Sequence, residues 1–342
     1  MISFLRSFFR PSEGLTSETT STLSPGFILR GAKWDYRILE PMNGDSTHGS
    51  IVYKAKVEPH EDDINAPQWA VIKVAHDENT KQSMGRELAF YSLPNVASRQ
   101  CFRQLYDVID DDTIALEWLD TTLQDVEYQP DLSTYILIEE VLRVALTSAA
   151  ILGNLGHVNA DYKPANILIS RADNGRVTAK VGDFGQVYPT GVHTKVQPYA
   201  MRAPEIFKDQ TCTERSQVWA IAAMVLVWMN PDLLGVGDCP HSAIDESWCR
   251  MKMKLLFPDQ VHFADYDYIQ QLFSLIVPGF VKAQPKLEAI FTFEEETEVL
   301  GVPQEIRDVL RLMFVVDKDQ RPSASSVLDS AEFEALEKFV EI

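Results

Sequence analysis

The sequence contains few cysteines, and it lacks any apolar run long enough to cross a membrane. Its cysteines show no paired CxxC spacing, which argues against a zinc site and against a disulfide framework. We therefore predict reduced, mostly buried thiols of an intracellular protein at Cys101, Cys212, Cys239 and Cys249. The longest apolar run, residues 218–229, is well short of the roughly 20 residues that a membrane span needs. It predicts a buried core helix instead.

Basic residues are also in deficit. The chain has 31 Lys and Arg against 50 Asp and Glu, which gives a formal net charge of −19 at pH 7. A general nucleic-acid binder needs a basic surface for phosphates, so we expect no nucleic-acid partner. An acidic surface suits solubility and basic protein partners, and it leaves the oligomeric state open.

The opening segment, residues 1–33, is rich in Ser and Thr and has no sustained periodicity, so it predicts a flexible tail. Its first residues, "MISFLRSFFR", carry arginines and precede any acid, which weakly resembles an amphipathic mitochondrial presequence. Arginines are few, however, and Pro11 ends any helix early. We expect a cytoplasmic or nuclear protein, with a mitochondrial location as the alternative.

The remainder of the chain changes character at residue 120. In residues 34–119, short β-branched runs such as "SIVYKAKV", "WAVIKVA" and "TIALEWL" surround one helical stretch, "NTKQSMGRELAFYSL". Residues 120–342 are rich in helical segments and open with the long "DLSTYILIEEVLRVALTSAAILGNLG". This order predicts an α+β protein with a small β-rich N-terminal lobe, a larger helical C-terminal lobe and a cleft between them.

Polar side chains interrupt otherwise apolar stretches at Lys73, Glu87, Asp161, Lys163, Asn166 and Asp183. A buried charge without a partner is strongly destabilising, so each needs an opposite charge, a metal or a ligand phosphate. Lys73 and Glu87 can neutralise one another. Asp183 and Asn166 can share a divalent metal through oxygen ligands, which Mg²⁺ prefers.

The order and spacing of these residues resemble the eukaryotic protein kinase superfamily. Lys73 matches the family's strand lysine, Glu87 its helix glutamate, and "DYKPAN" from Asp161 its catalytic loop. The metal-binding "DFG" is unaltered at residues 183–185, and "APE" at residues 203–205 closes the activation segment. Downstream, Arg321 in "DKDQRPS" matches the arginine that pairs with that glutamate. The resemblance is to a divergent Ser/Thr-type kinase, similar to kinase-like proteins of filamentous fungi.

The resemblance implies ATP- and Mg²⁺-dependent phosphoryl transfer to Ser/Thr hydroxyls of proteins. Lys73, held by Glu87, would contact the α- and β-phosphates. Asn166 and Asp183 would hold Mg²⁺. Asp161 would orient the incoming hydroxyl and accept its proton, while Lys163 would balance charge on the phosphoryl group. A lysine two positions after the catalytic aspartate is the Ser/Thr-kinase pattern.

The resemblance also implies where adenine would bind. Val52 and Val71 would lie above the base and Leu168 below it. The base edge would meet the backbone of Glu117 and Leu119, with Leu116 at the back of the pocket.

Three departures from the family pattern favour an alternative, a pseudokinase that serves as a scaffold with or without bound nucleotide. The glycine-rich loop keeps only Gly44 and Gly49, and Ser50 stands where its last glycine would align. Residues 159–160 are Asn-Ala where the family has His-Arg, which makes this a non-RD kinase. Gln217 replaces the aspartate that anchors the catalytic loop. A third reading, a small-molecule kinase, is disfavoured because such enzymes typically lack the Ala-Pro-Glu segment.

The missing arginine has a consequence for regulation. Without it, a phosphate on the activation segment loses its main counter-charge. We therefore predict activity that does not depend on phosphorylation of Thr190, Thr194 or Tyr199. Asn159 would also remove an aromatic packing element beneath Phe184 and Tyr91.

Overall fold

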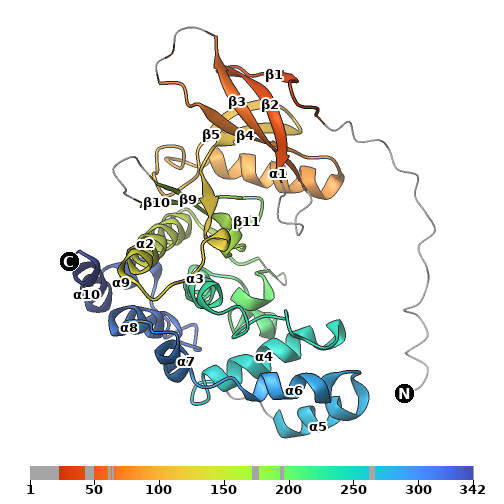
Figure 1. Ribbon diagram of the computed structural model, residues 1–342, viewed down its shortest axis with the longest axis vertical. Coiled ribbons are helices and arrows are strands. Elements are labelled where there is room, and N and C mark those ends of the chain that lie inside the picture. Colours follow the sequence, from red (N-terminus) through yellow and green to blue (C-terminus); the bar gives the residue numbers. More distant parts are fainter. Residues whose placement is uncertain are drawn as a thin grey trace.

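The computed structural model describes residues 23–42, 50–60, 63, 65–171, 177–192, 196–261 and 266–341. Three sequence predictions concern residues outside these ranges: the presequence-like opening, the glycines at 44 and 49, and Thr194. The described chain forms a sheet-rich lobe above a helical lobe (Figure 1). This is the predicted α+β, two-lobed architecture.

The upper lobe is built on a six-stranded sheet in the order β1-β2-β3-β4-β6-β5, in which every neighbouring pair is antiparallel. Helix α1 (Glu78–Tyr91) lies beneath the sheet, facing the lower lobe (Figure 1). A capping box between Asp77 and Thr80 starts this helix. The strands are β1 (Ile28–Arg30), β2 (Trp34–Met42), β3 (Ile51–Pro59), β4 (Trp69–Val74), β5 (Leu105–Asp110) and β6 (Thr113–Glu117).

The predicted flexible tail is wrong for residues 23–33. Strand β1 pairs with β2, the main-chain N–H of Gly26 donates to Ile38, and that of Leu23 donates to the Tyr53 hydroxyl. The short run "FILR" supplies apolar side chains to this edge, but its Ser/Thr-rich surroundings hide the strand pattern. The sheet-rich lobe therefore starts before residue 34.

The lower lobe is organised around two buried helices, α2 and α3. Helix α2 begins after Asp131, whose carboxylate accepts the N–H of Thr134, and most of its apolar positions are buried. Helix α3 contains the apolar run 218–229 and is buried along nearly its whole length, which confirms the predicted core helix. The helices are α2 (Leu132–Asn154), α3 (Glu214–Met229), α4 (Asp245–Leu256), α5 (Tyr266–Ile276), α6 (Phe280–Glu288), α7 (Phe293–Val299), α8 (Gln304–Met313), α9 (Ala324–Leu328) and α10 (Ala331–Val340).

Small strands line the side of the lower lobe that faces the sheet. One group has the order β10-β9-β7, and a second pairs β8 with β11. Their bounds are β7 (Thr121–Thr122), β8 (His157–Asn159), β9 (Ile167–Arg171), β10 (Val177–Val181) and β11 (Val187–Pro189). The turns between these strands carry the predicted catalytic loop and the "DFG" segment.

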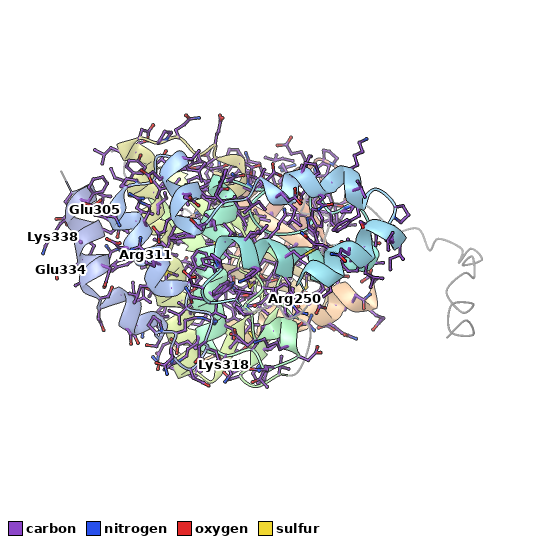
Figure 2. The ribbon with its side chains drawn as sticks, turned by 90° about the horizontal axis from the view of Figure 1, so that it is seen from below. Arg250, Glu305, Arg311, Lys318, Glu334 and Lys338 are labelled. Atoms are coloured by element: carbon purple, nitrogen blue, oxygen red, sulfur yellow. The ribbon has the colours of Figure 1, made fainter. Side chains whose placement is uncertain are left out.

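Most of the thiols are buried, as the sequence analysis predicted, and the outer surface carries ion pairs. Glu334 and Lys338 on α10 form an ion pair at the outer surface of the lower lobe (Figure 2). Cys101, Cys212 and Cys249 are buried free thiols, whereas Cys239 is half-buried. Across the described ranges, every helix is too short or too polar to cross a bilayer.

Candidate active site

Lys73 lies at the centre of a charge network that joins the two lobes. Its Nζ on β4 contacts Glu87 Oε2 on α1 at 2.7 Å and Asp183 Oδ1 at 3.0 Å. The Glu87 side chain is fully buried, and its second oxygen accepts the main-chain N–H of Phe184. One glutamate therefore fixes both the lysine and the turn that carries Asp183.

The network keeps Lys73 positively charged at neutral pH. Burial alone would lower the pKa of its ammonium group, but the charges of Asp183 and Glu87 and the hydrogen bonds from them raise this pKa above its ordinary value. The Asp183 side chain remains 30% exposed, whereas that of Lys73 is only 9% exposed. A permanent cation thus lies beside a carboxylate that is open to the cleft.

The Phe184 ring contacts three aromatic rings, and the sequence analysis named only that of Tyr91. Its ring stacks on Phe90 with the centroids 3.8 Å apart, and it meets Phe102 and Tyr91 edge-on. Phe90 and Phe102 supply the aromatic contact that the analysis had expected Asn159 to remove. Neither residue belongs to a motif, and only the apolar pattern of its segment marked it as a core candidate.

The catalytic loop brings three predicted residues into direct contact. Asn166 lies in a single 3₁₀ turn, Pro164–Asn166, and its Nδ2 donates to the carbonyl of Asp161 at 2.8 Å and to its carboxylate at 2.9 Å. Lys163 Nζ is 3.1 Å from the same carboxylate. All three side chains are buried. The loop therefore holds a carboxylate, an ammonium group and an amide in contact with one another.

The catalytic loop and the "DFG" turn are hydrogen-bonded neighbours. The N–H of Gly182 donates to the carbonyl of Asn166 at 2.8 Å, which places Asp183 one residue from that contact. Because the Asn166 Nδ2 group donates its hydrogen bonds to Asp161, the Asn166 Oδ1 atom is left to act as a metal ligand. An amide oxygen and a partly exposed carboxylate are ligands that suit Mg²⁺.

Gln217 holds the catalytic loop from below through its amide oxygen. Its Oε1 accepts the N–H of Asn159 at 2.7 Å, and Asn159 Oδ1 accepts the N–H of Asp161 at 3.0 Å. Among the described residues, neither Asn159 Nδ2 nor Gln217 Nε2 has a hydrogen-bond partner, although both are buried. The amide thus fulfils the acceptor role and leaves two buried donors unsatisfied.

The residues predicted to bind the base lie on β3, β4, β6 and β9 and on the segment that follows β6. Val52 and Val71 pack in one cluster with Leu116. Leu168 lies on β9, and a Cβ placed on Gly182 would come within 2.7 Å of its Cδ1. Leu119 is buried just after β6.

The main-chain carbonyl of Glu117, at the end of β6, is already occupied. Arg103 Nε donates to it at 2.7 Å. Sequence reasoning missed Arg103 because a single arginine beside a predicted strand gives no indication of where its side chain points.

The activation segment is anchored at its far end by a buried ion pair. Arg321 donates to both carboxylate oxygens of Glu205, at 2.8 and 3.0 Å, and its side chain is completely buried. Burial alone would raise the pKa of Glu205, but hydrogen bonds and charge from Arg321 hold it below its usual range. This is the pairing that the "APE" motif and Arg321 predicted.

A two-lobed fold with a lysine–glutamate–aspartate network across its cleft defines a kinase-like protein. The sequence matches the protein kinase domain family over residues 50–333. It is also similar to the serine/threonine-protein kinase mos of Gallus gallus, with 25% identity over 193 residues. That alignment covers 54% of this chain and 44% of the relative, so this chain spans less than half the length of that kinase. The chain belongs to the protein kinase superfamily.

Proposed function

We propose that this protein is a Ser/Thr protein kinase that transfers the γ-phosphoryl group of ATP to protein hydroxyls. The smaller lobe would end at residue 119 and the larger lobe would begin at residue 120. One observation carries the proposal: the network of Lys73, Glu87 and Asp183 is joined to the loop of Asp161 and Asn166 by the hydrogen bond from Gly182. A single cleft thus has a cation for phosphates, oxygen ligands for a metal and a base for a hydroxyl.

Each charged residue would act where its present contacts hold it. Lys73 is kept cationic and pointed by Glu87, so it would bind the α- and β-phosphates. The Asp161 carboxylate would orient the substrate hydroxyl and accept its proton. Lys163, 3.1 Å from that carboxylate, would offset negative charge on the transferred group.

The metal would be Mg²⁺, held by Asn166 and Asp183, and it would neutralise charge between the β- and γ-phosphates. The geometry fits because Asn166 turns its amide nitrogen to Asp161, leaving its oxygen for a ligand. The left-handed backbone of Asp183, with φ of 55°, supports the same reading. Non-glycine residues adopt this strained conformation where the surrounding structure or function demands it.

Substrate class rests on less specific features. A lysine two residues after Asp161 and the similarity to a serine/threonine kinase both favour Ser/Thr acceptors. The net charge of −19 favours basic protein substrates. We place the activity in the cytoplasm or nucleus, with the mitochondrion as the alternative.

Phosphotransfer from radiolabelled ATP to a generic basic protein tests the proposal. Asp161→Asn removes the base, and we expect it to slow transfer by about 10²- to 10⁴-fold. Asp183→Ala removes a metal ligand and should abolish transfer. Asp259→Ala, an exposed acid in the loop after α4, serves as the matched control. Equal activity of the wild type and both site variants would refute catalysis by this cleft.

A pseudokinase scaffold is the second candidate, and the contact between Arg103 and the Glu117 carbonyl favours it. The unsatisfied amides of Asn159 and Gln217 point the same way, because they weaken the anchor of the catalytic loop. This candidate predicts no phosphotransfer above the Asp161→Asn background. Thermal shifts with ATP, measured with and without Mg²⁺, would then separate a nucleotide-binding scaffold from a nucleotide-free one.

A further inference from the structure

Arg103 takes the backbone acceptor that an adenine base would need. Its Nε lies 2.7 Å from the carbonyl oxygen of Glu117, on the strand that leads into the connection between the lobes. In the proposed function, this carbonyl receives the 6-amino group of adenine. A base that enters from the side of Arg103 meets the guanidinium at this oxygen, so the two donors compete for it.

The position of Arg103 is fixed by its own backbone. Its N–H donates to Val181 at 2.9 Å, and its carbonyl accepts the hydroxyl of Tyr91 at 2.9 Å. The side-chain stem then runs past Gly182, where Cδ would lie 3.6 Å from a Cβ built on that glycine. Leu168, the expected floor of the base site, crowds the same glycine. The arginine stem therefore lies beside the place proposed for the base.

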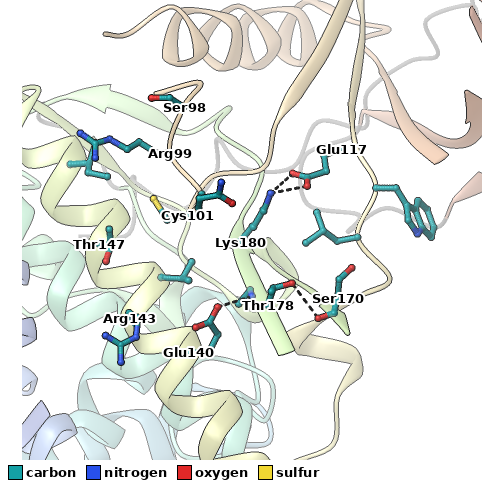
Figure 3. A pocket seen from close by; sticks show the side chains of 16 residues that line it. Ser98, Arg99, Cys101, Glu117, Glu140, Arg143, Thr147, Ser170, Thr178 and Lys180 are labelled. Atoms are coloured by element: carbon teal, nitrogen blue, oxygen red, sulfur yellow. Dashed lines mark hydrogen bonds and ion pairs between the residues drawn. The ribbon is translucent and has the colours of Figure 1, made fainter. Parts of the chain in front are cut away.

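Glu117 is held in position from the opposite side. Its carboxylate accepts two hydrogen bonds from Lys180 on β10, at 2.7 and 2.8 Å (Figure 3). It also accepts the main-chain N–H of Gln104 at 3.0 Å. Glu117 and Lys180 line a cavity of about 790 Å³. Because three hydrogen bonds from two donor groups fix the Glu117 side chain, its carbonyl cannot readily turn away from Arg103.

The guanidinium group of Arg103 has few hydrogen-bond partners in the described part of the chain. Within the described part of the chain, Arg103 forms no ion pair, and the Glu117 carbonyl is its one side-chain hydrogen-bond acceptor. Burial lowers its pKa below the ordinary arginine value. A guanidinium carries five N–H donors, so most of its hydrogen-bonding capacity is unused. This side chain gains little from its surroundings and can be displaced.

We propose that Arg103 is a specificity-determining residue that competes with adenine for the Glu117 carbonyl and so keeps the affinity for ATP low. ATP binds only when the Arg103 side chain has swung out, and the apparent affinity falls by the fraction of molecules in that state. The inference rests on the proposed function, because it assumes that the cleft binds a nucleotide base at this edge.

Two variants test the competition in the full-length protein. Arg103→Met keeps most of the stem but removes the donors, and Arg103→Val shortens the stem as well. We expect isothermal titration calorimetry to show MgATP binding roughly 10- to 100-fold more tightly to either variant, as expected for removal of one charge-assisted hydrogen bond. Arg99→Met is the matched control, since Arg99 is exposed on the same segment and does not bond to Glu117. Its affinity should equal that of the wild type.

Base selectivity provides a readout that a merely structural role would not change. Purine riboside triphosphate lacks the 6-amino group of ATP but keeps the N1 acceptor, so it can bind without displacing Arg103 from the Glu117 carbonyl. The wild type should therefore discriminate little between ATP and purine riboside triphosphate, whereas Arg103→Met should prefer ATP by about tenfold, the worth of one hydrogen bond. This wild-type ratio remains informative even if both variants fail to fold.

Three results would overturn the proposal: equal ATP affinity in wild type and variants, a strong wild-type preference for ATP over purine riboside triphosphate, or no binding to any of the proteins. In the last case another feature, and not Arg103, blocks the cleft. Tighter ATP binding by Arg103→Met without phosphotransfer would support the role of Arg103 and refute the kinase activity instead. The two claims can thus fail separately.

Discussion

Arg86 Nε donates a 2.6 Å hydrogen bond to the main-chain carbonyl of Gly185. The helix that carries Glu87 therefore also grips the turn that carries Asp183. The guanidinium lies over the ring of Tyr188 on β11, and a Cβ on Gly185 would meet Ser83 Oγ at 2.0 Å. Only glycine allows α1 to approach this closely, so the position of the helix and the conformation of the turn are coupled.

Removing the hydrogen bond between Arg86 and Gly185 should lower turnover as well as stability. In Arg86→Met the turn loses a charge-assisted bond worth about 1.5–3 kcal/mol, which we expect to reduce kcat about tenfold or more. Steady-state phosphotransfer and urea unfolding measure the two effects. Lys81→Met on the same helix, which loses only an exposed pair with Asp112, is the control. Reduced stability with an unchanged kcat would contradict a positioning role for Arg86.

Gln217 is expected to matter through its oxygen and not through its nitrogen. In Gln217→Met the buried N–H of Asn159 loses its acceptor, which costs about 1–3 kcal/mol, and the catalytic loop loses its anchor. Both the free energy of unfolding and kcat should fall. Gln210→Met at an exposed position should leave both unchanged. If Gln217→Met is as stable and active as the wild type, the anchor is dispensable.

The activation segment is held without a phosphate. Gln197 Nε2 donates to Ser216 at 3.1 Å, its Oε1 accepts the N–H of Ala203, and its carbonyl accepts two bonds from Arg202. Complete dephosphorylation should therefore leave turnover unchanged, as measured on phosphatase-treated protein with the modification state checked by mass spectrometry. Gln197→Ala should reduce it. A collapse of activity after phosphatase treatment would show that a phosphate is required.

The buried pair of Glu205 and Arg321 should make stability fall in acid. Because the folded-state pKa of Glu205 lies below its ordinary value of 4.5, its contribution is present above about pH 4.5 and is lost as the pH falls through the folded-state pKa. Glu205→Gln breaks the pair and should cost roughly 3–5 kcal/mol at neutral pH.

Urea unfolding of the wild type and Glu205→Gln across this pH range measures the linkage. The stability gap between the two proteins should narrow in acid, since the wild type also loses its carboxylate there. A gap that stays constant from neutral pH to below pH 4.5 would show that the carboxylate is not the titrating group.

The residues proposed for catalysis stand out in the sequence because their chemistry is restrictive. A lysine inside "VIK" and an aspartate after "KVG" interrupt apolar strands, so their side chains must find partners, and the spacing of the other motifs identifies them. The long helices could also be predicted from the sequence, because an apolar pattern sustained over many residues fits only a helix. The structure places Lys73, Glu87 and Asp183 together as that reasoning requires.

The remaining features depend on the direction of individual side chains. Phe90 and Tyr91 are adjacent in the sequence, yet only the packing of α1 decides which ring stacks on Phe184. Arg103 is a second example. It belongs to no motif, and its contact with Glu117 depends on how two neighbouring segments pack in the structure. Strand β1 was missed because it is only three residues long and follows a Ser/Thr-rich stretch.

The sheet of the upper lobe extends beyond the family match, which starts at residue 50, and this affects how the protein can be handled. Strands β1 and β2 come earlier in the chain, and Trp34, Tyr36 and Ile38 pack directly into the core beside Tyr53. Truncating the chain to the matched segment would leave β3 as an unpaired edge strand and would expose apolar side chains that β2 now covers. We expect such a fragment to aggregate, so recombinant expression of this kinase domain should retain the residues from 23 onward.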